Sequence, residues 1–135
     1  MIVSGPRRES WGVEDYRKLA AWRQAHAFTL QVYSIVRNFP FEERFGLTAQ
    51  LRRAALSIGA NIVEGRARAT DRAFALYLEQ AGASAAESEY LLLVAHDVGY
   101  LTADDHELLE RRINSVRRLL AALRARVLAS ALRKR

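Results

Sequence analysis

The C-terminal third of the chain repeats apolar residues three and four positions apart, which is the spacing of one face of an α-helix. The repeat runs through Leu109, Ile113, Val116, Leu120, Leu123 and Val127. Thr102 and the acidic residues after it are typical of a helix start. The segment therefore predicts an amphipathic helix, and this periodicity, rather than the composition, argues against an all-β fold.

Three earlier segments have the same periodicity and predict helices over residues 18–38, 47–64 and 71–98. Pro40 ends the first, because the residue before a proline avoids the helical conformation. Gly65 and Gly99 are natural stops for the second and third helices, and Thr70 is expected to cap the start of the third. Gly82 lies inside the third helix, where a glycine costs about 1 kcal/mol relative to alanine. We expect a close helix–helix approach at Gly82 to justify that cost.

Four amphipathic helices with short connections predict an all-α fold, an antiparallel up-down-up-down four-helix bundle. We expect one domain over residues 16–132, which is long enough to bury a core. Residues 1–15 lack periodicity and contain two glycines and a proline, so we interpret them as a flexible N-terminal arm. Residues 133–135 are expected to form a basic C-terminal tail.

The composition narrows the classes of protein that remain. There is no cysteine, which excludes disulfides and thiolate metal sites. The charge-free stretches are too short to span a bilayer, and the first residues show no apolar signal region. The sequence therefore predicts a cytoplasmic protein with no membrane partner.

Positive charge is concentrated at one end of the sequence. Residues 1–110 carry 12 basic and 15 acidic side chains, whereas residues 111–135 carry nine basic and no acidic ones. Such asymmetry suggests an anionic partner, RNA or DNA, although it is also typical of the solvated face of a helix. No aromatic residue lies beyond Tyr100, so we expect contacts to phosphates rather than base stacking. The candidate nucleic-acid-binding residues are Arg111, Arg112, Arg117, Arg118, Arg124, Arg126, Arg133, Lys134 and Arg135.

A line of polar residues borders the apolar arc of the second predicted helix. Its members, spaced three or four apart, are Gln50, Arg53, Ser57, Asn61 and Glu64. They predict a structural polar network, because buried polar groups must be hydrogen-bonded. The alternative is a catalytic or ligand site around Asn61 and Glu64. Glu64 lies roughly 16 Å from Arg53 along the axis of the same helix, which is too far for a direct ion pair. We therefore expect Arg53 to pair with a carboxylate on another helix, namely Glu87 on the third.

The sequence contains no recognisable catalytic or metal motif. We find no glycine-rich phosphate loop, nucleophile elbow or zinc motif. A di-iron bundle needs Glu-x-x-His pairs, and no glutamate stands three residues before His26, His96 or His106. We expect His26 to lie bonded at the core edge and the other two histidines to lie on the surface. The sequence predicts a non-enzyme with no catalytic residues, metal or cofactor.

A set of short motifs between residues 16 and 101 is specific when its members are taken together. They are Leu19-Ala-Ala-Trp22, Ala25-His26, Tyr33, Phe39-Pro40, Glu43-Arg44-Phe45-Gly46-Leu47, Gln50-Leu51-Arg52-Arg53-Ala54, Ser57-Ile58, Asn61-Ile62, Glu64-Gly65, Ala81-Gly82, Ser84 and Glu87. In these motifs the chain resembles the four-helix-bundle proteins encoded in intervening sequences of bacterial 23S ribosomal RNA genes, although it has glycine at position 59 where such proteins usually have proline.

The resemblance implies an antiparallel bundle that tends to form homopentameric rings, and it implies no settled biochemical activity. A related branch, the accessory protein of diversity-generating retroelements, works beside a reverse transcriptase, which is a partner by analogy only. The first hypothesis is an oligomeric, non-catalytic accessory factor that binds nucleic acid through its basic C-terminal helix. The alternative is a protein–protein scaffold that binds no nucleic acid.

Overall fold

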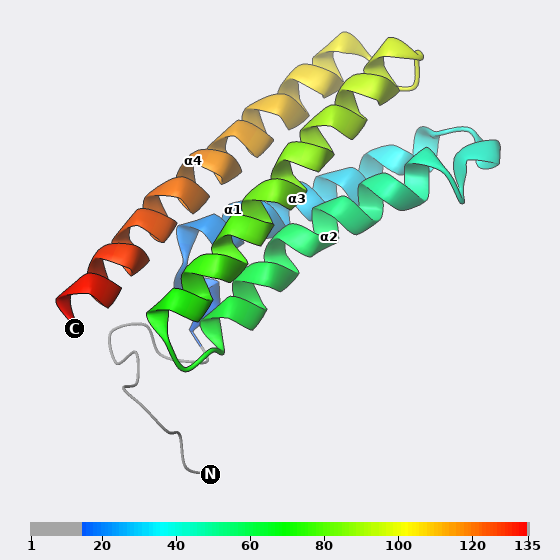
Figure 1. Cartoon of the computed structure of the whole chain (residues 1–135). Helices are drawn as coiled ribbons and strands as arrows, with labels where there is room; N and C mark the ends of the chain where they lie inside the picture. The colour runs from blue at the N-terminus through cyan, green and yellow to red at the C-terminus, as the bar shows by residue number, and fades with distance from the viewer. Residues whose placement is uncertain (1–14, 135) are drawn as a thin grey trace.

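The computed structural model of the chain describes residues 15–134, which form a four-helix bundle whose helices run alternately up and down (Figure 1). The α-helices are α1 (Ala20–Ile35), α2 (Leu47–Arg66), α3 (Asp71–Asp97) and α4 (Ala103–Arg133). Three single turns of 3-10 helix are η1 (Tyr16–Lys18), η2 (Val36–Asn38) and η3 (Phe41–Glu43). Each α-helix packs against two neighbours, and the contact of α1 with α4 closes the bundle. Within residues 15–134, no helix is both long and apolar enough to cross a membrane.

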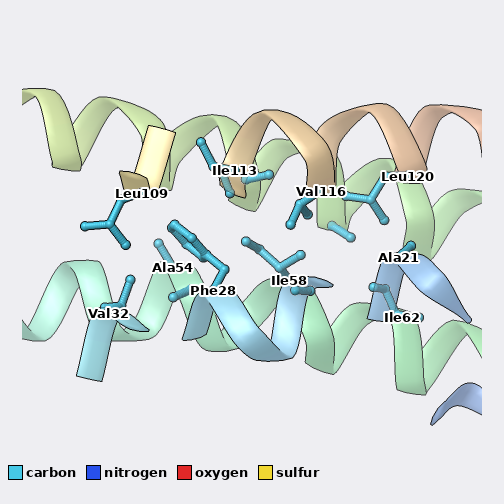
Figure 2. Close-up of a cluster of buried hydrophobic side chains, with 14 of the residues drawn as sticks. Ala21, Phe28, Val32, Ala54, Ile58, Ile62, Leu109, Ile113, Val116 and Leu120 are labelled. Carbon is cyan, nitrogen blue, oxygen red and sulfur yellow. The ribbon is translucent and has the colours of Figure 1, made fainter. Parts of the chain in front are cut away.

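The core forms where the apolar stripes of the helices meet (Figure 2). Phe28 of α1 and Ile58 of α2 are fully buried and face Ile113 of α4. All six members of the repeat between Leu109 and Val127 are buried. The three-and-four spacing of α4 thus corresponds to the seam by which α4 joins the bundle.

Hydroxyl side chains cap the starts of the two longest helices. The Thr70 Oγ1 atom accepts a hydrogen bond from the Ala73 backbone N–H at 3.2 Å, at the start of α3. The Thr102 Oγ1 atom accepts from the Asp105 N–H at 3.1 Å, at the start of α4. Each bond satisfies a backbone donor that the helix itself leaves without a partner.

Two glycines have the opposite roles from those that the sequence predicts. Gly65 does not end α2, which continues to Arg66. A Cβ atom at Gly65 would lie 2.6 Å from the Tyr77 Cβ atom and 2.9 Å from the Phe74 Cδ1 atom, so the close approach of α2 and α3 occurs there. At Gly82, by contrast, a Cβ atom would meet nothing within 4 Å. The close approach expected at Gly82 is absent within residues 15–134.

The ends of the helices differ from the predicted ends by a few residues. The helix α1 begins at Ala20 rather than at residue 18, because Lys18 belongs to η1, and residues 36–38 form the 3-10 turn η2 rather than the last turn of α1. The helix α4 includes Arg133, which we assigned to the tail. The predicted arm, apart from Asp15, and the last residue of the predicted tail lie outside the described residues. Gly99 follows α3 with φ of +90°, a left-handed conformation that favours glycine.

Candidate nucleic-acid interface

Two arginines on one flank of α4 form ion pairs with α3. The Arg117 guanidinium lies 2.6 Å from the Glu89 carboxylate, and the Arg124 guanidinium lies 3.1 Å from the Glu79 carboxylate. These pairs follow from the spacing of α4, because Arg117 and Arg124 are one heptad apart and so lie on one face. Part of the charge that the sequence concentrates in α4 is therefore balanced by acids from α3.

Two further arginines of α4 also have partners within the bundle. The Arg111 guanidinium pairs with Glu107 at 2.9 Å, one turn earlier on the same helix. Arg112 turns toward α1, where its guanidinium donates to the Gln24 side-chain oxygen at 2.8 Å and to that of Gln31 at 3.2 Å. Arg112 is half-buried and links α1 to α4, which is a structural role.

The remaining candidate cations have more varied surroundings. Arg118 and Arg133 are exposed and form no ion pair among residues 15–134. The Lys134 ammonium lies 3.2 Å from the Asp71 carboxylate, whose side chain is only 3% exposed. Arg126 is exposed beside a shallow groove between α1 and α4. Arg135 lies outside the described residues.

The fold brings a second group of cations to the C-terminal end of α4. The Lys134–Asp71 contact places this end beside the start of α3, and the α2–α3 turn lies at the same end of the bundle (Figure 1). Arg68 and Arg72 are exposed on and after that turn, and the Arg68 guanidinium lies 5.0 Å from the centre of the Tyr77 ring. We call Arg68, Arg72, Arg133 and Lys134 the basic end.

The sequence reasoning missed the contribution of Arg68 and Arg72 to the basic end. The signal was available, since residues 66–72, which span the connection between the second and third predicted helices and the start of the third, contain three arginines. In an up-down-up-down bundle, the second connection and the end of the fourth helix lie at the same end. Combining the predicted topology with this short arginine-rich turn would have found the cluster.

The opposite end of the bundle is acidic. The α1–α2 and α3–α4 connections meet there, where the Tyr100 hydroxyl donates to the Glu43 carboxylate at 2.9 Å. Acidic side chains on or beside these connections are Glu42, Glu43, Asp97, Asp104, Asp105 and Glu107. Acidic and basic side chains therefore gather at opposite ends of the bundle, with the basic end at the α2–α3 turn.

The predicted polar network is only partly assembled. The Ser57 and Ser84 hydroxyls lie 2.8 Å apart between α2 and α3. The Asn61 amide donates to the Ser57 carbonyl at 2.8 Å and lies 3.1 Å from its hydroxyl. The other four predicted members are exposed, namely Gln50, Arg53, Glu64 and Glu87.

The expected Arg53–Glu87 ion pair does not form among the described residues. At about 100° per residue, Arg53 lies about 80° around the helix from Asn61. Ser57 contacts Ser84 of α3, whereas Arg53 is turned toward solvent.

The histidines do not form a metal site in residues 15–134, where no group of three or more metal-ligating side chains is found. His26 is exposed and stacks on Trp22 with ring centres 4.8 Å apart, rather than lying bonded at the core edge. The His96 and His106 rings stack at 4.6 Å beside the α3–α4 connection. His96 contacts Asp97, and His106 contacts Glu110.

Fold and surface together define an all-α four-helix-bundle protein with oppositely charged ends. The model of the 23S rRNA-intervening sequence protein family matches residues 17–122, and the chain belongs to this family. No curated protein matches the chain significantly.

A solved structure has the same fold. It is the 1.70 Å crystal structure of a protein with unknown function from the S23 ribosomal protein family of Bacteroides thetaiotaomicron VPI-5482. The match has a TM-score of 0.72 and 24% sequence identity, and it covers 78% of this chain and 95% of that chain. Neither description names an enzymatic activity.

Proposed function

We propose that the protein is a non-catalytic, oligomeric accessory factor that binds the phosphate backbone of RNA or DNA. Binding uses the C-terminal part of α4 together with the basic end. Lysine and arginine contacts to phosphates release counterions and read little sequence. The proposed binding is therefore weak in the single chain, indifferent to sequence and sensitive to salt.

The convergence of Arg68, Arg72 and Arg133 at one end of the bundle is the observation that carries the proposal. These side chains come from separate parts of the sequence, and all three are exposed. They form no ion pair among residues 15–134, in contrast to Arg117 and Arg124, whose charges are balanced by α3. Phosphate contacts are therefore assigned first to the basic end and Arg118, and only secondarily to the paired arginines.

Fluorescence anisotropy of a labelled single-stranded oligonucleotide at several salt concentrations tests the proposal. Four phosphate contacts correspond to a slope of log K against log salt of about −3. Charge reversal by Arg68→Glu together with Arg133→Glu should make this slope less steep, by the amount that corresponds to about two phosphate contacts. The matched control reverses Arg111 and Arg117, which have carboxylate partners, and should change the slope less.

A scaffold without nucleic-acid binding is the second candidate function. It is favoured by large apolar side chains that are exposed on α3, where Tyr90 is 63% and Leu76 is 54% exposed. Such side chains are typical of protein–protein contacts. Absence of oligonucleotide binding at low salt would refute the nucleic-acid function and leave the scaffold.

The oligomer in the proposal is a ring of identical chains, with a pentamer favoured by the family resemblance, in the cytoplasm. A ring would present several basic ends together and raise the local positive potential. By analogy to the accessory proteins of diversity-generating retroelements, the proposal includes a reverse transcriptase as a protein partner. Light scattering on a size-exclusion peak at two concentrations tests the oligomer, and a mass of one chain at both would contradict it.

A further inference from the structure

Three aromatic rings lie in contact with one another on α1 and on the turn η1 that precedes it. The Trp22 and His26 rings are stacked, with their centres 4.8 Å apart and their planes 9° from parallel. The Tyr16 ring meets the Trp22 ring edge to face, with ring centres 5.1 Å apart. Trp22 and His26 are four residues apart, so both side chains lie on the same face of α1. We call Tyr16, Trp22 and His26 the aromatic ladder.

The aromatic ladder is supported by α2 and ends in an exposed ring. A Cβ atom at Gly59 of α2 would lie 3.7 Å from the Trp22 Nε1 atom, so the indole rests on that helix. Trp22 is half-buried, whereas His26 is exposed. Because Trp22 covers one face of the His26 ring, the exposed area of the imidazole lies on its other face and its edges. A further planar group can extend the stack on that side.

Cations surround the aromatic ladder, and little negative charge balances them. Arg17, Lys18 and Arg23 are exposed, and α1 contains no acidic residue. Lys18 pairs with Asp15 at 3.2 Å, but Arg17 and Arg23 form no ion pair among residues 15–134. The one acidic residue of α2 is Glu64, which lies about 140° around that helix from the glycine that the indole contacts. The surroundings of the ladder are therefore positively charged.

The aromatic ladder also adjoins the basic end of the bundle. The start of α1 lies at the same end as the α2–α3 turn and the last turn of α4 (Figure 1), and η1 contacts α2 directly. A strand whose phosphates are held by the basic end can therefore bring its bases to the rings of α1. The C-terminal segment, which has no aromatic residue of its own, is thus combined with rings from another part of the sequence.

We propose that the aromatic ladder is a stacking site for the bases of single-stranded RNA or DNA, with a base on the exposed side of His26. This inference rests on the proposed function and adds a base contact to its phosphate contacts. Cations beside aromatic rings suit such a strand, because the cations attract phosphates while the rings stack on bases. Stacking is tolerant of sequence, since every base has a flat π face. Single strands are favoured over duplexes, whose bases are already stacked on one another.

A strand without bases separates stacking from phosphate binding. The probes are a short labelled oligothymidine, whose bases stack little on each other, and an abasic strand of the same length and charge. Fluorescence anisotropy at low salt should show that the wild-type chain binds the oligothymidine at least about fivefold more tightly, since one stacked base contributes a factor of about 5–150. Higher salt should weaken both affinities and leave their ratio nearly unchanged.

Substitutions of His26 assign the effect to the aromatic ladder. His26→Ala removes the ring that receives the base and should make the two affinities equal. His26→Phe keeps a planar ring over Trp22 and should preserve the wild-type ratio. Tyr90→Ala is the matched control, because it removes a 63% exposed ring from α3, outside the ladder, and should also preserve the ratio. His26→Gln replaces His26→Ala if circular dichroism shows that the latter is unfolded.

The outcomes are distinguishable. If the wild type binds both strands equally, the stacking proposal is wrong while the proposed phosphate binding stands. If neither strand binds at low salt, the proposed function itself is wrong, and the stacking site with it. If His26→Ala keeps the wild-type ratio, the bases do not stack on the aromatic ladder. If His26→Ala instead lowers the mass measured by light scattering, a second copy of the chain covers the ladder, and the proposal is overturned.

Discussion

Replacing Gly65 with alanine should destabilise the bundle, even though alanine favours helix formation. The new Cβ atom would lie 2.6 Å from the Tyr77 Cβ atom, which is attached directly to the α3 backbone and cannot rotate away. Ordinary contact begins at 3.4 Å, so α2 and α3 must separate locally by about 0.8 Å. Overpacking of this kind costs about 1–3 kcal/mol, and the helix propensity of alanine recovers about 1 kcal/mol. The expected net loss is about 0–2 kcal/mol.

Gly59 supplies a matched control on the same helix. A Cβ atom there would lie 3.7 Å from its nearest neighbour, the Trp22 Nε1 atom, which is ordinary contact. Gly59→Ala should therefore gain up to about 1 kcal/mol from helix propensity alone. The two substitutions are chemically identical and should differ by about 1–3 kcal/mol in the free energy of unfolding.

Urea unfolding followed by circular dichroism measures this difference, with all variants at one protein concentration because association shifts apparent stability. Gly65→Ala should have a lower urea midpoint than the wild type, and Gly59→Ala a higher one. If Gly65→Ala were as stable as Gly59→Ala, the close approach of α2 and α3 would not be what requires a glycine at position 65. The assignment of opposite roles to the glycines would then be refuted.

Three smaller effects should also be measurable. Thr102→Ala removes the cap of α4 and should cost about 1 kcal/mol in urea unfolding. The Glu43 carboxylate accepts a hydrogen bond from the Tyr100 hydroxyl, and this bond raises the pKa of Tyr100 above its usual value of 10.0. The stability from this bond should be fully present below pH 10 and should fall as the pH rises further, and Tyr100→Phe should reduce that alkaline loss. A double-mutant cycle on Arg117→Ala and Glu89→Ala should give a coupling of about 0–1 kcal/mol, because both side chains are partly exposed; a coupling above 2 kcal/mol would contradict this view.

The architecture follows closely from local periodicity. The repeat between Leu109 and Val127 identifies α4 and its buried face, and Thr70 and Thr102 mark the starts of α3 and α4. These features depend on neighbours three or four residues away, so the sequence contains them directly. The antiparallel order then follows from short connections.

Contacts between helices were much harder to predict. The rotation of α2 decides that Ser57 meets Ser84 while Arg53 faces solvent, and it depends on how both helices pack. Gly65 lies between Glu64 and Arg66, whereas Gly82 lies between Ala81 and Ala83, so their neighbours in the sequence favour a close approach at Gly82 rather than at Gly65. Only the position of α3 shows that the first is crowded and the second is open.

The candidate nucleic-acid interface in the structure differs from the one predicted from the sequence for the same reason. The sequence shows nine cations within 25 residues, but it does not show that α3 places Glu79 and Glu89 opposite two of them. The predicted topology, in contrast, places the arginine-rich connection between the second and third helices at the end of the bundle where the fourth helix ends, so this part of the cluster could have been predicted. Charge asymmetry along a sequence predicts an anionic partner more readily than it predicts which residues contact it.

The mass of the protein with and without a short oligonucleotide tests the central claim most directly. Size-exclusion chromatography with light scattering at low salt should give several chains of 15.3 kDa in one particle, to which the oligonucleotide binds and from which high salt releases it. A particle of one chain that leaves the oligonucleotide unbound at low salt would contradict both the oligomer and the nucleic-acid function.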